Sequence, residues 1–151
     1  MVDRALSPVV GVVCLLAVTV VLATVVGATA PMVSPSIPTT ASFSATAEPT
    51  GELTVTHQGG DSIAPAAIDL RIHIEDEPLE TQPPVPFFSA RGFESGPTGP
   101  FNSATTGQWR AGETAALRIA GTNSPTIQPG DTVTIGLYAD GDRVTELETT
   151  A

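Results

Sequence analysis

The hydrophobic residues of this chain follow two different patterns. Residues 6–30 form one apolar segment without a charged residue, whereas beyond residue 40 apolar and polar positions alternate. The valines of the first segment would point to every side of a helix, so no polar face is left for water. As a helix, residues 6–30 would be roughly 37 Å long, against about 30 Å for the hydrocarbon core of a bilayer. We therefore expect a long hydrophobic helix that lies in a membrane or packs among like helices.

Alternation with a period of two residues predicts β-strands in the second part of the chain. The strongest signal lies in residues 67–75, where four isoleucine and leucine residues alternate with polar ones. The other predicted strands are 41–47, 52–57, 113–120, 131–139 and 143–149. No helical period of useful length occurs there, so the region after residue 40 is expected to be rich in β-structure.

Turn residues separate these strands. Gly59-Gly60-Asp61 and Asp140-Gly141-Asp142 predict tight turns, because glycine accepts a positive φ and Asp-Gly is common in hairpins. The acidic residues 75–77, followed by Pro78, are expected to end the strand 67–75.

Prolines mark two segments without long regular structure. In residues 31–40 they end the helix and predict either a semi-rigid extended spacer or a disordered linker. Residues 78–112 form a long loop rich in proline and glycine. The loop holds most of the aromatic residues: Phe87, Phe88, Phe93, Phe101 and Trp109. It could fold over the sheet as a lid or present a sticky surface, and we favour the lid because Trp109 precedes a strand.

The charge of the chain is strongly acidic. It has 151 residues, with 16 Asp and Glu against 6 basic residues, all of them Arg, and a net charge of −10. Because the charges of Asp3 and Arg4 cancel, the whole net charge belongs to the residues beyond Ala30. The length of this part of the chain is typical of one domain. Such a charge disfavours nucleic acid and anionic lipid surfaces as partners of that domain.

An acid excess without lysine is similar to the composition of proteins adapted to high salt, where screening weakens the repulsion between like charges. We predict that the isolated domain loses stability when it is moved from molar salt to dilute buffer. Thermal unfolding in the two solutions tests this, and equal melting temperatures would contradict it.

Residues that could carry catalysis or bind a metal are few. His57 and His73 complete no nucleophile–base pair and no metal-ligand spacing, so both are expected to be solvated on strand faces. The acidic residues 75–77 and 140–142 offer oxygen ligands for calcium without the spacing of a known calcium loop. Cys14 follows Val13 instead of the small residue that a lipoprotein signal requires, and we expect it to be an apolar helix residue. The sequence therefore indicates no enzyme, no cofactor and no metal site.

The amino terminus carries the most specific motif. It reads Arg4-Ala5-Leu6-Ser7-Pro8-Val9-Val10-Gly11-Val12. This string closely resembles the amino-terminal signature of haloarchaeal type IV pilins. The resemblance implies that a prepilin peptidase cuts between Ala5 and Leu6, reading Arg4, Ala5, Leu6 and Ser7, and that the apolar helix becomes the new amino terminus. Val10 stands where bacterial relatives carry a glutamate, so a charge match between neighbouring amino termini is not expected.

Three motifs of the second half resemble the head domain of the same family. They are Leu53 to Asp61 (LTVTHQGGD), Trp109 to Glu113 (WRAGE) and Pro129 to Val133 (PGDTV). The resemblance implies an α+β fold class, with one long N-terminal hydrophobic helix followed by a β-rich, immunoglobulin-like sandwich. It divides the chain into a leader (1–5), a transmembrane and filament-core helix (6–30), a linker (31–40) and an extracellular head (41–151).

The function that the resemblance implies is that of a structural pilus subunit serving adhesion. The implied partners are other pilin subunits, the prepilin peptidase, the pilus assembly machinery and the membrane. The subunit would span the cell membrane once, with its head outside, before it joins a surface filament. Packing of the filament core is expected to involve Pro8, Val9, Val10, Gly11, Val12 and Gly27, with the glycines allowing close approach.

Other interpretations of residues 6–30 remain. Ala28-Thr29-Ala30 has the form of a signal-peptide cleavage site, although the apolar run is long for such a peptide and Pro31 follows the cut. A plain membrane anchor is the third interpretation. The competing function is accordingly a monomeric extracellular binding module tethered to the membrane, with the loop 78–112 as its site.

Overall fold

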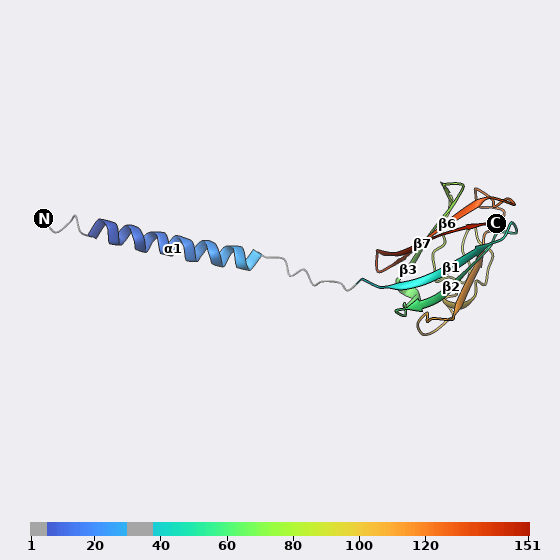
Figure 1. Cartoon of the computed structure of the whole chain (residues 1–151), viewed down its shortest axis with the longest axis horizontal. Coiled ribbons are helices and arrows are strands. Elements are labelled where there is room, and N and C mark those ends of the chain that lie inside the picture. Colours follow the sequence, from blue (N-terminus) through green and yellow to red (C-terminus); the bar gives the residue numbers. More distant parts are fainter. Residues whose placement is uncertain (1–5, 30–37) are drawn as a thin grey trace. The chain divides into compact units, whose positions relative to one another are not determined.

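A computed structural model describes residues 6–29 and 38–151, and within the helix it describes the side chains of residues 8–24 (Figure 1). Contacts divide the chain into two compact units, with the boundary between residues 36 and 37. The first unit contains one helix, and the second contains two β-sheets.

The helix α1 runs from Leu6 to Thr29. Pro8 lies in its first turn, where the helix requires no backbone N–H from it. Two hydroxyl groups along the helix are satisfied internally: the Oγ1 atoms of Thr19 and Thr24 donate to the carbonyls of Leu15 and Val21, each at 2.8 Å. At these two positions the hydroxyl groups therefore need no partner outside the helix.

The predicted fold class, α+β with one long hydrophobic helix ahead of an immunoglobulin-like head, is wrong. Among the residues that the structure describes, no helix is both long and apolar enough to cross a membrane. The part of α1 with described side chains, residues 8–24, covers roughly 25 Å at 1.5 Å per residue, less than the ~30 Å core of a bilayer. The fold is a β-rich sandwich accompanied by this one helix.

The second unit is built from seven strands in two antiparallel sheets (Figure 1). The first sheet has the order β1-β2-β5, and the second has the order β4-β3-β6-β7. The strands are β1 (Ala41–Ala47), β2 (Glu52–Gly60), β3 (Ile68–Ile74), β4 (Glu77–Pro78), β5 (Thr114–Arg118), β6 (Thr132–Ala139) and β7 (Asp142–Thr150). The strand β1 also lies close to β7 of the other sheet.

The periodicity of the sequence located these strands well, with two differences. Gly59 and Gly60 do not form the predicted turn, because β2 continues through them and pairs them with Ser42 and Ala41. A bulge in this pairing lets Gln58 be the extra residue of β2. The acidic residues 75–77 do end β3, but the chain then turns back, with Glu75 and Asp76 at positive φ, and forms the short β4.

The core lies between the two sheets and is completed by the loop 78–112. Inward residues of β2, β3 and β6 are almost fully buried, as their alternation predicts. The aromatic side chains that the loop adds to this core are Phe87, Phe93, Phe101 and Trp109. Their burial confirms the lid interpretation, because only Phe88 of the loop aromatics is exposed.

Asn123 holds this loop in place from a buried position. Its side-chain oxygen accepts a hydrogen bond from the N–H of Thr81 at 3.1 Å, and its Nδ2 donates to the carbonyl of Thr81 at 2.9 Å. The same Nδ2 lies 3.3 Å from the carbonyl of Gly92. One buried amide thus joins two parts of the lid, so the lid is a fixed part of the fold.

Candidate functional site: helix surface and head entry

The structure places the predicted processing residues at the beginning of α1 or before it. Arg4 and Ala5 lie outside the described residues. Leu6 and Ser7 are the first two residues of α1. The structure therefore leaves the predicted cleavage between Ala5 and Leu6 as a prediction.

The predicted packing residues form a continuous apolar surface in the first half of α1. Val9, Val10 and Val12 are 57–61% exposed, and a Cβ added to Gly11 would meet no atom within 4 Å. Gly27 belongs to α1 but lies outside the residues with described side chains. The other exposed large hydrophobic residues of α1 are Val13, Leu15, Leu16, Val18, Val20, Val21 and Leu22. A helix surface of this kind is stable in water only when other apolar groups cover it.

The first residues of the head are held by a pair of hydrogen bonds. The N–H of Asp61 donates to the carbonyl of Thr40 at 2.9 Å, and the N–H of Thr40 donates to Oδ2 of Asp61 at 3.0 Å. Gly60 makes this approach possible: its φ is +99°, and a Cβ there would clash with the carbonyl of Thr40 and with Ala41. Thr40, the residue that precedes β1, is thus held by hydrogen bonds to Asp61, the residue that follows β2.

His57 supports this attachment from inside the core. Its Nε2 lies 2.9 Å from the carbonyl of Asp61, and since a carbonyl can only accept, Nε2 carries the proton. Its Nδ1 is buried and has no hydrogen-bond partner. The expectation of a solvated histidine at this position is wrong. The reason is that His57 shares the inward parity of Leu53 and Val55 in β2.

Trp109 packs against His57 and completes the arrangement. The ring is fully buried, with the centroids of Phe43 and His57 at 4.8 and 6.0 Å. Its Nε1 donates to the carbonyl of Glu113 at 3.0 Å, and the backbone N–H of His57 donates to the same carbonyl. We call Thr40, Gly60, Asp61, His57 and Trp109 the entry cluster.

The entry cluster brings together two of the three head motifs that the sequence singled out. LTVTHQGGD supplies β2 and its end, and WRAGE supplies Trp109 and the carbonyl of Glu113 that it shares with His57. The third motif lies elsewhere: the backbone N–H of Asp131 donates to the carbonyl of Gln128, and its carbonyl accepts from the N–H of Ala151. The sequence alone predicts turns and strand starts at these motifs, and nothing in the local pattern places residues 57 and 109 next to each other.

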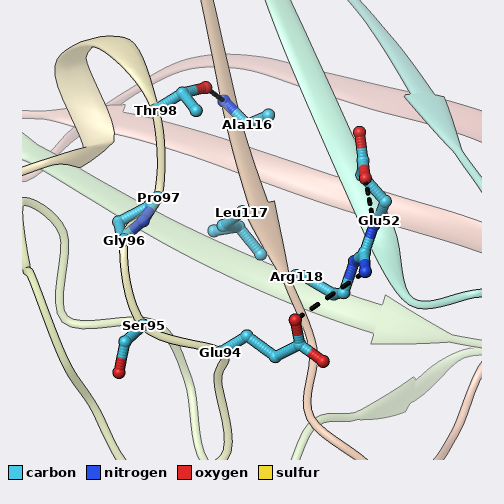
Figure 2. A pocket seen from close by; sticks show the side chains of 9 residues that line it. All are labelled: Glu52, Glu94, Ser95, Gly96, Pro97, Thr98, Ala116, Leu117 and Arg118. Atoms are coloured by element: carbon cyan, nitrogen blue, oxygen red, sulfur yellow. Dashed lines mark hydrogen bonds and ion pairs between the residues drawn. The ribbon is translucent and has the colours of Figure 1, made fainter.

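A small pocket lies beside β5, lined in part by residues 94–98 of the loop (Figure 2). Its volume is about 190 Å³. In Figure 2 the guanidinium of Arg118 lies between two carboxylates, with Glu52 at 2.6 Å and Glu94 at 3.7 Å. The hydrogen bond to Glu52 and the charge of Glu94 raise the pKa of Arg118. All three side chains reach solvent, so the two ion pairs are screened and contribute little to stability.

The described residues contain no group of three or more His, Cys, Asp or Glu side chains placed to hold a metal ion. No family model and no curated protein matches this chain.

Proposed function

We propose that this chain is a structural subunit of a surface filament of the archaeal type IV pilus class, and that the filament serves adhesion. The observation that carries the proposal is the apolar surface of α1, which has no charged residue and needs apolar cover. In the proposed filament, copies of α1 provide this cover for one another. The resemblance of residues 4–12 to the pilin processing signature supports the same function.

Packing of α1 against its copies would be driven by dispersion and close helix contact. A helix covered by valine and leucine offers no hydrogen bonds or ion pairs to a neighbour, so shape must select the partner. Gly11 provides a position without a side chain at which a neighbouring helix can approach closely. The partners in this proposal are other copies of the subunit, a prepilin peptidase and the machinery that builds the filament. The location of the subunit before assembly stays a prediction from the sequence.

The entry cluster fits the proposed role of the head. A head that decorates a filament is connected to the filament core through one chain segment, so any pull on the head passes through Thr40. The paired hydrogen bonds between Thr40 and Asp61 hold this point to β2, and the buried ring of His57 holds Asp61. The head is therefore expected to resist pulling at its amino-terminal end.

Amino-terminal sequencing of filaments sheared from cells tests the proposal. We expect this chain in the filaments, with Leu6 as its first residue. Replacement of Ala5 by a bulky residue, Ala5→Leu, is expected to leave the chain uncut and to remove it from the filaments. The matched control is Ala17→Leu, within α1 and away from the cut, which leaves processing intact.

Two results would contradict the proposal. A mature chain that begins at Met1 and is never recovered in filaments would favour the monomeric tethered binding module. A chain that begins at Pro31 would favour a secreted domain.

A further inference from the structure

Phe88 is the one large hydrophobic side chain exposed on the head, within the described residues 38–151. Its exposed fraction is 62%, whereas the neighbouring loop aromatics Phe87, Phe93 and Phe101 are at most 6% exposed. The loop therefore buries its other aromatic rings and leaves this one in water. A single exposed ring is common on protein surfaces, so its meaning depends on how it is held and on what surrounds it.

The backbone on both sides of Phe88 is fixed. On one side, the N–H of Phe87 donates to the carbonyl of Phe101 at 2.9 Å, and the carbonyl of Phe87 accepts from the N–H of Ser103 at 3.1 Å. On the other side, the carbonyl of Phe88 accepts from the N–H of Gly96 at 2.8 Å. The backbone that carries the ring is thus held in place, so only the side chain of Phe88 has to be ordered when it contacts a partner.

The loop segment that carries Phe88 has almost no charge, unlike the rest of the head. Residues 81–109 contain only one acidic and one basic residue, Glu94 and Arg91, although the chain as a whole carries −10. Pro84 is also exposed, and Val85 and Pro86 are partly exposed. A charged group loses hydration when it contacts an uncharged apolar surface, so this charge-poor segment is the part of the head that can make such a contact at the least cost.

We propose that Phe88 and the adjoining residues 84–86 are the contact through which the heads attach to uncharged apolar surfaces. This inference rests on the proposed pilin function and names the kind of surface to which the filament adheres. The contact of a single head is weak, because only one ring and a few neighbouring groups are covered. A filament presents many copies at once, and their combined attachment is much stronger than that of one head.

The test measures the retention of purified filaments on polystyrene in molar salt. Phe88→Ser is expected to lower retention at least about fivefold, the change that follows from losing one partly buried Phe contact per head. Phe88→Leu keeps an apolar side chain and is expected to retain most of the attachment. The matched control is Ala104→Ser, an exposed change in the same loop, which leaves retention unchanged.

A second material, oxidised polystyrene, distinguishes attachment through apolar contact from attachment through polar or charged groups. On the same plastic made hydrophilic by oxidation, wild-type filaments are expected to bind weakly, and Phe88→Ser is expected to change little. If Phe88→Ser filaments assemble normally and still bind polystyrene like the wild type, the inference is wrong while the proposed function stands. If the chain is absent from filaments altogether, both are wrong.

Discussion

Trp109→Ala is expected to lower the stability of the head by about 3 to 5 kcal/mol, the range for removing a large buried aromatic side chain. The ring is fully buried among Phe43, His57 and Phe101, with centroid distances of 4.8, 6.0 and 5.4 Å. Its removal leaves a cavity and takes away one of the two N–H donors to the carbonyl of Glu113. Thermal unfolding of the full chain in molar salt measures the loss, which should lower the head's melting temperature by about 15 °C.

Phe88→Ala is the matched control for this variant. It removes an aromatic ring from the same loop, but that ring is mostly exposed. Its effect on stability is expected to stay within about 0.5 kcal/mol. A loss for Trp109→Ala as small as that expected for Phe88→Ala would show that the Trp109 ring does not belong to the core.

Gly60→Ala is expected to destabilise the head by at least about 3 kcal/mol, combining backbone strain at positive φ with steric overlap. The added Cβ would overlap the carbonyl oxygen of Thr40 and lie 2.7 Å from the Cα of Ala41. Both are backbone atoms that cannot move away without breaking the paired hydrogen bonds between Thr40 and Asp61. The free energy of unfolding in denaturant, measured on the same chain, gives the effect.

The adjacent glycine provides the control for this experiment. Gly59 has an ordinary backbone conformation, and a Cβ there would meet only Oγ of Ser42 at 3.7 Å. Gly59→Ala is expected to change the stability by less than about 1 kcal/mol. A result in which the two variants are equally stable would contradict the close approach of Thr40 to β2.

Local sequence patterns predicted most strands because their information is local. The alternation of Ile68, Leu70, Ile72 and Ile74 defines both the strand and its buried face without reference to any other segment. The turn at Asp140 and Gly141 was predictable for the same reason, and both residues have the positive φ that such a turn requires. The predicted turn at Gly59-Gly60 failed because the same two glycines serve a pairing with Ser42 and Ala41.

In the candidate site, too, some features follow from the local sequence and others depend on tertiary contacts. The exposed apolar surface of α1 follows from its composition, since a segment of valine and leucine without charge has no polar face whatever its surroundings. The burial of His57 follows from its parity with Leu53 and Val55 in β2, although histidine is fully buried less often than leucine or valine. Its unpartnered Nδ1 could not be predicted, because it depends on the packing of Phe43 and Trp109.

The sequence by itself determined where most of the strands lie, that an apolar segment within residues 6–30 is helical, and that the head is acidic. Only the tertiary structure decided that Thr40 meets Asp61, that Trp109 packs on His57, and that the loop buries all its aromatic rings except Phe88. The physical reason is the range of the interactions. Periodicity and turn chemistry act between neighbours in the chain, whereas these contacts join segments about twenty to fifty residues apart, and their choice of partner depends on how the whole sandwich closes.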